Sequence, residues 1–226
     1  MDNLLLKDII QWDVLSWKKA IDFWEENISW DKVTNVLEIG ARDGGLSLWL
    51  ALKNKNVICS DISNSEKAIQ LHKKYHVDYL VSYQDIDATN IPYENYFDVV
   101  IVKSVLGGIG SYGNNNSQQK AIQEIHKSLK KGGKFLFAEN LKASLIHQLA
   151  RKKFVKWGNS WKYLTIEETH SLLSKFSDYK INTTGFIAAF GRSESQRNIL
   201  ARIDNFILNK ITPNYWHYIV YGIATK

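Results

Sequence analysis

The stretch Val36-Leu37-Glu38-Ile39-Gly40-Ala41-Arg42-Asp43-Gly44-Gly45 decides the fold of this chain, and an apolar segment at residues 46–52 follows at once. A short apolar run, a glycine-bearing turn and a second apolar segment predict a strand, a tight turn and a helix. This order is the opening unit of a doubly wound α/β sheet, whose ligands lie at the carboxyl ends of the strands. We therefore expect the functional site beside this turn.

The residues of the turn limit what can bind there. A dinucleotide-binding turn has glycine at its second position, so that the backbone can approach a pyrophosphate. Arg42 occupies that position, and its side chain would crowd the phosphates. Glu38 closes the strand, and an acid there favours a ligand with an amine because opposite charges attract. On this stretch alone, a generic α/β turn remains equally consistent.

Length and composition favour one α/β domain. The chain has 226 residues, 45% of them hydrophobic, which suffices for a full core. No apolar run approaches the ~20 residues needed to cross a bilayer, and the start, Met1-Asp2-Asn3, lacks the basic residues of a secretion signal. The single cysteine, Cys59, excludes an internal disulfide and a cysteine-built zinc site. We expect a cytoplasmic protein without a metal.

Basic residues are concentrated in one part of the sequence. The net charge is +6, and between Glu124 and Glu167 the only acid is Glu139, against ten lysines and arginines. Such a run is often a solvated face. It could also form a surface that holds an anionic acceptor, such as a phosphorylated or nucleotide-linked molecule. Nucleic acid is a further option, although no recognised reading module accompanies the basic run.

Hydrophobic periodicity predicts alternating strands and helices in a single domain without a linker. We expect the strands at residues 36–39, 56–61, 79–83, 97–102, 134–138, 179–190 and 218–225. We expect the helices at residues 4–28, 46–52, 65–75, 118–129, 165–176 and 194–209, the fifth with Thr165 and Glu168 as a capping box. Residues 111–119 are expected to form a mobile loop, and residues 130–133 the stop after the fourth helix. Residues 141–164 are the least regular part, and His72 and His76 are interpreted as surface residues.

Further acids and glycines stand where strands are expected to end. Asp61 falls about twenty residues beyond the glycine turn, where a carboxylate can accept both ribose hydroxyls of an adenosine. Asp87 precedes the small Ala88, so it could reach an exocyclic amine while Ala88 leaves room for a flat ring. Capping a helix or forming a turn would be the ordinary roles of these acids. Gly107, which follows the central strand, predicts close approach of the backbone to a ligand.

The ordered set of these motifs resembles class I S-adenosylmethionine-dependent methyltransferases over most of the chain. Residues 38–44 resemble the first motif of the family, residues 97–100 the fourth-strand motif and residues 129–134 the fifth. The resemblance implies a Rossmann-like doubly wound sheet of seven strands, mostly parallel with a C-terminal antiparallel strand and with helices on both faces. Two residues depart from the family pattern: Arg42 replaces the usual second glycine, and Lys131 the usual proline.

The resemblance implies S-adenosyl-L-methionine as the cofactor and assigns residues to it. Glu38 would face the methionine amine, the turn would pass the methionine part, Asp61 would hold the ribose, and Asp87 with Ala88 the adenine. The implied cofactor-binding residues are Glu38, Gly40, Ala41, Arg42, Gly44, Asp61, Ile62, Asp87, Ala88, Lys103 and Ser104. An in-line methyl transfer depends mainly on the orientation of the acceptor, the methyl group and the sulfur.

A narrower resemblance is to bacterial methyltransferases of surface-polysaccharide or O-antigen biosynthesis. It implies a small-molecule or glycan acceptor, a phosphate- or nucleotide-linked sugar, which agrees with the basic region. We expect residues 1–30 to form a helical cap and residues 141–164 a basic insertion near the acceptor. The implied acceptor-binding residues are Trp17, Gly107, Trp157, Trp161 and Arg192.

The sequence leaves open which residue would act as the base for a hydroxyl acceptor, and it is consistent with two other functions. His147 and Glu139 are candidates for the base, because both follow the fifth strand. A histidine on a helix surface and an arginine in a surface ion pair are ordinary structural readings of His147 and Arg192. An RNA methyltransferase using residues 127–162, or a non-catalytic protein that binds S-adenosylmethionine, would fit the same motifs.

Overall fold

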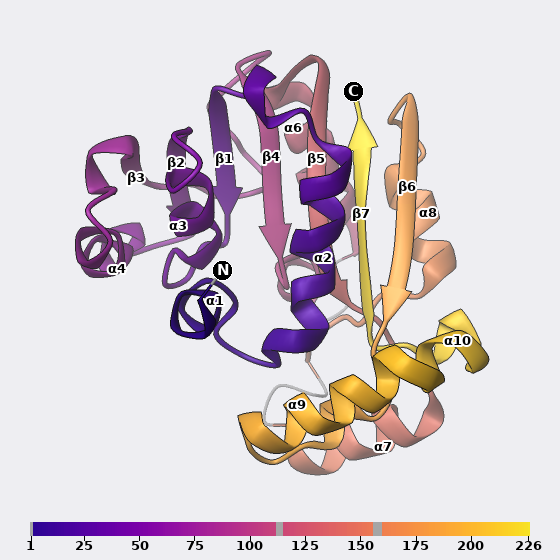
Figure 1. Ribbon diagram of the computed structural model, residues 1–226. Coiled ribbons are helices and arrows are strands. Elements are labelled where there is room, and N and C mark those ends of the chain that lie inside the picture. Colours follow the sequence, from indigo (N-terminus) through magenta and orange to yellow (C-terminus); the bar gives the residue numbers. More distant parts are fainter. Residues whose placement is uncertain (1, 112–114, 156–159) are drawn as a thin grey trace.

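The computed structural model describes residues 2–111, 115–155 and 160–226. Seven strands form one sheet in the order β3-β2-β1-β4-β5-β7-β6 (Figure 1). Neighbouring strands are parallel except at β7, which is antiparallel to both β5 and β6. The predicted mostly parallel, seven-stranded sheet is confirmed. The strands are β1 (Asn35–Ile39), β2 (Asn56–Asp61), β3 (Val81–Asp85), β4 (Phe97–Lys103), β5 (Leu129–Asn140), β6 (Asp178–Thr184) and β7 (Ile219–Thr225).

Helices cover both faces of the sheet. One face packs against α1 (Asn3–Ile10), α2 (Val14–Asn27), α3 (Gly45–Ala51) and α4 (Ile69–Lys74), and the other against α5 (Leu106–Ile109), α6 (Asn115–Ser128) and α8 (Ile166–Leu173). Three further helices are α7 (Leu145–Phe154), α9 (Glu194–Ile203) and α10 (Asn209–Ile211). They lie at the end of the molecule where the parallel strands finish (Figure 1).

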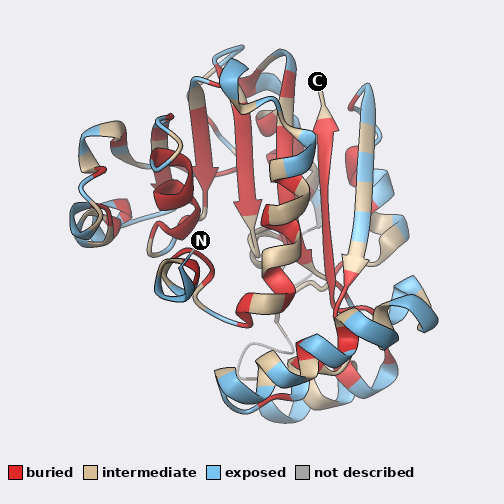
Figure 2. Cartoon of the chain, viewed as in Figure 1, coloured by how far each residue is buried: buried red, intermediate tan, exposed pale blue. Residues whose placement is uncertain are grey.

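The core consists of two layers of buried side chains, one on each face of the sheet. In β1, Val36 belongs to the first layer and Leu37 to the second, because successive side chains of a strand point to opposite faces. Strands buried on both faces explain the continuous apolar runs in the sequence. Figure 2 shows the central strands as buried along their length, whereas the edge strand β6 is partly exposed.

The N-terminal segment differs from its prediction. Residues 4–28 do not form one helix, because the backbone has positive φ angles at Gln11 (73°) and Asp13 (50°), which end α1 and begin α2. The α1 helix packs on α3, and α2 crosses the sheet over β7 and β5. Trp24 anchors α2 by donating its indole N–H to the carbonyl of Gly222 in β7, at 3.0 Å.

The ends of several other strands and helices differ from those expected. The strand expected at residues 79–83 lies at Val81–Asp85, and β6 ends at Thr184 because Gly185 has φ +81°. The expected helix stop at residues 130–133 is the first part of β5. The α6 helix takes in part of the expected loop, and residues 112–114 lie outside the described part of the chain.

The C-terminal third is more helical than expected. The supposedly irregular residues 141–164 contain α7. The capping box between Thr165 and Glu168 is confirmed at the start of α8. A π-helical turn at Asp204–Leu208 joins α9 to α10, so the helix expected at residues 194–209 runs on to Ile211.

Candidate active site at the carboxyl ends of the strands

The glycine-bearing turn has the backbone that its sequence requires. Gly40 and Gly44 have φ angles of +67° and +79°, which glycine adopts without strain. Arg42 reaches a similar conformation, with φ 54°. Its side chain is 77% exposed and pairs with Asp43 at 3.4 Å, so it points away from the turn. An arginine in place of the second glycine therefore does not put its side chain against the turn.

His72 supports this turn by contacting the carbonyl of Gly44. The sequence did not indicate this role. The expectation that it is a surface residue is wrong, because its side chain is fully buried. One ring nitrogen lies 2.9 Å from the carbonyl oxygen of Gly44 and the other 2.8 Å from the hydroxyl of Tyr83. A Cβ atom at Gly44 would lie 2.8 Å from the ring. Its position in α4, one helical turn before His76, gave no signal of this role.

Asp61 ends β2 with its carboxylate beside the turn. One carboxylate oxygen accepts a hydrogen bond from the backbone N–H of Arg42 and the other from that of Ile62, both at 2.8 Å. Each oxygen keeps a second acceptor site, which a ribose hydroxyl could use. The side chain of Ile62 is largely exposed and provides an apolar surface next to that carboxylate.

Asp87 and Ala88 follow β3 on the same edge of the sheet. One oxygen of the Asp87 carboxylate accepts from the N–H and the hydroxyl of Thr89, so the segment is a turn in which the second oxygen remains available. Ala88 is buried. Asp85, which ends the strand, is used differently: it accepts from the N–H groups of Asn64 and Ser65 and fixes the connection after β2.

Three charged residues lie close together where β1, β4 and β5 end: Glu38 and Glu139 are buried, and Lys103 is half-buried. Glu38 accepts from the N–H of Ser47 at 2.6 Å and also from its hydroxyl, which holds the start of α3. Burial raises the pKa of Glu38 to about 7. Burial lowers the pKa of Lys103 to about 8, against the opposing effect of the Glu38 and Glu139 carboxylates. The Lys103 ammonium lies 4.9 Å from the centre of the Trp17 ring.

Glu139 lies at the end of β5 and uses only one of its two carboxylate oxygens for hydrogen bonds within the described residues. Its Oε1 accepts from the N–H groups of Val105 (2.7 Å) and Leu106 (2.9 Å), which fixes the loop after β4. Its Oε2 is buried and has no hydrogen-bond partner among the described residues. Burial raises the pKa of this carboxyl to about 7. An unpartnered buried oxygen is costly, so a ligand group that donates to it would be favoured.

The loop after β4 has strained backbone and close aromatic contact. Ser104 has φ 55°, and its hydroxyl accepts from the side-chain amide of Asn140 at 2.8 Å. Trp161 lies directly on the backbone of Gly107, where a Cβ atom would be 1.9 Å from the indole nitrogen. Lys162 donates its N–H to the Gly107 carbonyl at 3.0 Å. Gly107 and Trp161, two of the residues expected to bind the acceptor, therefore lie against each other.

A hollow of about 270 Å³ opens beside Trp161. Its wall combines aromatic rings with four cations and one carboxylate. Arg151 stacks over the ring of Tyr163 at 4.0 Å, a contact that fixes the guanidinium at the wall. The lining residues are Lys142, Gln148, Arg151, Lys152, Trp161, Lys162, Tyr163, Thr165 and Glu168. This composition suits a polar, anionic molecule.

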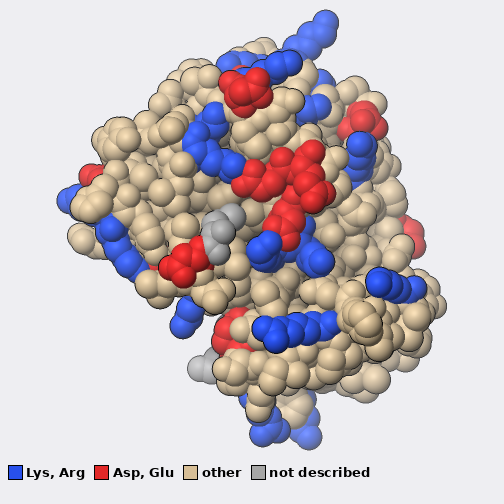
Figure 3. Space-filling model, in the orientation of Figure 1, with Lys and Arg blue, Asp and Glu red and all other residues tan. Residues whose placement is uncertain are grey.

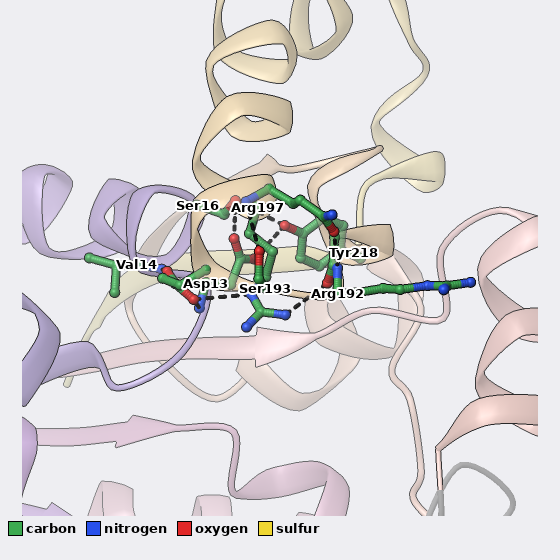
Figure 4. A network of polar contacts seen from close by, with 10 residues as sticks. Asp13, Val14, Ser16, Arg192, Ser193, Arg197 and Tyr218 are labelled. Atoms are coloured by element: carbon green, nitrogen blue, oxygen red, sulfur yellow. Dashed lines mark hydrogen bonds and ion pairs between the residues drawn. The ribbon is translucent and has the colours of Figure 1, made fainter.

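Two predicted residues do not join the group around Lys103. His147 is buried in α7, where one ring nitrogen lies 2.7 Å from the Ser144 hydroxyl and the other 2.7 Å from the Phe186 carbonyl oxygen. Both nitrogens are thus engaged in holding α7, and burial keeps the pKa of this imidazole below its usual value. Arg192 is exposed and points away from its neighbours in Figure 4. Trp157 lies outside the described residues.

A polar network connects the start of α2 with α9 and with Tyr218, which precedes β7 (Figure 4). The Tyr218 hydroxyl donates to the buried Asp13 carboxylate. Glu194 accepts from the N–H groups of Asp13 and Val14 and pairs with Arg197 at 3.0 Å. The ion pair with Glu194 therefore holds Arg197 within this network.

The basic residues at 127–162 do not form one surface. Lys130 pairs with Asp98 at 2.6 Å and Lys134 donates to the Thr225 hydroxyl, both near the start of β5. Lys142 and Arg151 follow the end of the same strand. At ~3.3 Å per residue, β5 separates the two groups by roughly 30 Å.

Some features are absent from residues 2–111, 115–155 and 160–226. In this part of the chain, histidine, cysteine and acidic side chains form no cluster of three or more that could hold a metal ion. No helix in the same residues is both long enough and apolar enough to span a bilayer.

Comparison with known proteins finds one matching family model and several similar solved structures. Residues 37–137 match the family described as "Methyltransferase domain". The structure is similar to Haemonchus contortus phosphoethanolamine N-methyltransferase 2 in complex with S-adenosyl-L-methionine, with a TM-score of 0.67 and 17% identity over 99% of this chain and 56% of that chain. The chain thus spans little more than half of that protein. A search of curated proteins found no match.

Two further solved structures share the fold. One is the MccD protein, with a TM-score of 0.61 and 20% identity over 92% of this chain and 96% of that chain. The other is the [4+2]-cyclase SpnF, with a TM-score of 0.61 and 16% identity over 92% of this chain and 80% of that chain. At these identities the similarities establish a common architecture.

Proposed function

We infer that this chain, whose residues 37–137 match a methyltransferase domain, is an S-adenosylmethionine-dependent methyltransferase acting on a small anionic acceptor. One observation carries the proposal. Glu38, Asp61 and Glu139 place three carboxylates along the rim of the sheet, near a turn that the positive φ angles of Gly40 and Gly44 make possible. Such a rim attracts a cation that also presents a ribose diol.

The residues present fit the cofactor. Asp61 would accept from the ribose hydroxyls, and the exposed side chain of Ile62 would contact the adenine together with Ala88. The available oxygen of Asp87 suits the exocyclic amine of that base. The two buried carboxylates, Glu38 and Glu139, outnumber the one ammonium of Lys103, so the group is complementary to a positively charged ligand.

The cofactor supplies a methyl group on a positively charged sulfur that is ready for displacement, and the protein supplies position and charge. An acceptor hydroxyl would donate its proton to the unpartnered Oε2 of Glu139. Its pKa of about 7 suits a group that accepts a proton near neutrality. Lys103, Ser104 and Gly107 would line the side from which the acceptor approaches.

The acceptor is proposed from the hollow beside Trp161. Trp161 and Tyr163 offer flat apolar faces on which a sugar ring can stack, while Lys142, Arg151 and Lys152 can pair with phosphate groups. Together with the narrower sequence resemblance, this composition supports a phosphate- or nucleotide-linked sugar of surface-polysaccharide biosynthesis. The division of the basic residues between two ends of the molecule weighs against a continuous RNA-binding surface.

The test is a methyl-transfer assay with labelled S-adenosylmethionine. The panel contains nucleotide-linked sugars, sugar phosphates, neutral sugars and structured RNA. We expect a methylated product from a phosphate-bearing sugar, and an acceptor KM raised at least tenfold by Trp161→Ala. Trp216→Ala, which removes an exposed tryptophan stacked on Phe186, is the matched control.

Two results would overturn the proposal. Tight cofactor binding without product from any acceptor would indicate a non-catalytic binding protein. A product from RNA alone, with a steep loss of RNA binding as salt rises, would indicate an RNA methyltransferase.

A further inference from the structure

The continuous helix formed by α9, the π-helical turn and α10 presents apolar side chains to solvent. Its outward positions follow the spacing of one helical face, three and four residues apart. A helix of a globular protein normally turns such a face toward the core. The exposed residues are Ile199, Arg202, Ile203, Phe206, Ile207, Lys210 and Ile211, and we call them the α9–α10 face.

The inward side of the same helix fixes this orientation. Asp204 is buried and accepts from the N–H groups of Phe186, Ile187 and Ala188, at 2.9 to 3.0 Å. Ala201 is also buried, one turn earlier. Rotating the α9–α10 face into the core would break the three hydrogen bonds to the buried Asp204 carboxylate, which costs free energy. The face therefore stays outward.

A second helix at the same end of the molecule has the same character. In α7, the exposed apolar residues Leu145, Ile146 and Leu149 share their side with Lys152 and Lys153. His147 on the opposite side is buried and contacts the Phe186 carbonyl, so α7 and the α9–α10 helix are anchored to one segment. Figure 1 places both at the end where the parallel strands finish.

The α9–α10 face and the outer side of α7 both carry positive charge. Residues 141–155 contain no acid, and residues 195–216 contain only Asp204, which is buried. Figure 3 shows blue and tan atoms over this end of the molecule, with little red. Two copies of the chain meeting here would bring like charges together, which is unfavourable. An anionic surface that also accepts apolar side chains is complementary to both features.

We propose that the α9–α10 face, together with the outer side of α7, docks on the surface of an anionic lipid bilayer. An amphipathic helix with basic residues beside its apolar face lies in the plane of the interface, with the apolar side chains among the upper acyl chains. The candidate active site opens at the same end of the sheet. Docking would therefore hold the site close to acceptors at the membrane surface.

The experiment is flotation of the full chain with vesicles, in the absence of cofactor and acceptor, so its outcome is independent of the proposed methyl transfer. Vesicles of phosphatidylcholine with phosphatidylglycerol should bind the protein, and vesicles of phosphatidylcholine alone should bind it more weakly. Phe206→Glu should reduce binding at least tenfold. Arg202→Ser and Lys210→Ser should each reduce it roughly fivefold.

Tyr79→Glu is the matched control, because Tyr79 is 77% exposed and Phe206 is 75% exposed. Neither change touches the core, and circular dichroism is used to check that each variant folds. The control should bind as the wild type does. Failure of the wild type to float with the anionic vesicles at low salt would overturn the proposal. So would a wild-type dimer that Phe206→Glu converts to a monomer, since the face would then join two copies.

Discussion

Lys103 Nζ lies 4.9 Å from the centre of the Trp17 ring, where the end of β4 meets the start of α2. A cation in this position is attracted by the negative face of the ring. The carboxylates of Glu38 and Glu139 act in the same sense, by favouring the charged form of the lysine. Burial opposes them and is the larger effect, so the pKa of Lys103 falls to about 8. The charge of Lys103 is thus sensitive to its immediate neighbours.

The first prediction concerns this contact. A double-mutant cycle with Trp17→Leu and Lys103→Met should give a coupling free energy of about 0.5–2 kcal/mol below pH 7. The coupling should disappear above pH 9, because the lowered pKa of about 8 means that the folded protein then holds Lys103 uncharged. Urea unfolding of the four proteins at both pH values measures it. Equal coupling at the two pH values would contradict a charge-dependent contact.

The second prediction concerns cofactor affinity. Asp61→Ala should weaken S-adenosylmethionine binding by ~1–3 kcal/mol, because charge-assisted hydrogen bonds to the ribose are lost. Isothermal titration calorimetry measures the change. Asp85→Ala is the control: it removes a carboxylate that ends the next strand but serves the backbone of Asn64 and Ser65. The control should lower the unfolding temperature and leave affinity unchanged. Unchanged affinity in Asp61→Ala would remove that residue from the site.

The sheet and its glycine turn could be predicted from the sequence because their signals are local. The run from Val36 to Gly44 carries hydrophobicity, turn chemistry and spacing within ten residues. Asp61 and Asp87 follow from the rule that acids at strand ends share one edge of a parallel sheet. Gly107 and Trp161 were each expected to bind the acceptor, but the contact between them spans more than fifty residues and no local pattern predicts it.

Other features depend on tertiary contacts that no local pattern encodes. The burial of His72 is decided by the packing of α4 on the turn at Gly44, and that of His147 by the carbonyl of Phe186. The break between α1 and α2 falls at Asp13, whose carboxylate bonds with Tyr218, some two hundred residues away. Local spacing therefore predicted a surface position for His72, a possible catalytic role for His147 and one unbroken helix before the first strand.

The third prediction concerns stability and pH. Burial raises the pKa of Glu139 from its ordinary 4.5 to about 7. Between pH 4.5 and pH 7, the folded chain holds a proton on Glu139 that the unfolded chain has released. The contribution of Glu139 to the free energy of unfolding therefore falls as pH rises. Glu139→Gln removes this titration. Relative to the wild type, the variant should gain on the order of 2 kcal/mol in unfolding free energy between pH 5 and pH 8. A difference independent of pH would show that the carboxyl titrates normally.

The fourth prediction links binding to protonation. A bound cation lowers the pKa of nearby carboxyls, so S-adenosylmethionine should release protons from Glu38 and Glu139 when it binds near pH 7. Calorimetry in two buffers of different ionisation enthalpy measures the number released. S-adenosylhomocysteine, whose sulfur is uncharged, should release fewer protons, and binding at pH 9 should release none from these groups. Equal release for both ligands would place the sulfur away from the two carboxylates.

The fifth prediction concerns the acceptor side of the site. A Cβ atom at Gly107 would lie 1.9 Å from the Trp161 indole nitrogen, whereas one at Gly108 would lie 3.2 Å from the same ring. Gly107→Ala must therefore displace Trp161, and overpacking of this kind costs about 1–3 kcal/mol of unfolding free energy. Gly108→Ala requires a shift of a few tenths of an ångström, and alanine favours the short helix α5, so its cost should be below about 1 kcal/mol.

Because Trp161 borders the hollow and not the glycine turn, Gly107→Ala should raise the acceptor KM and leave cofactor affinity intact. Tryptophan fluorescence, urea unfolding and calorimetry on the two variants separate these effects, and a loss of cofactor affinity in Gly107→Ala would mean that Trp161 lies on the cofactor side instead.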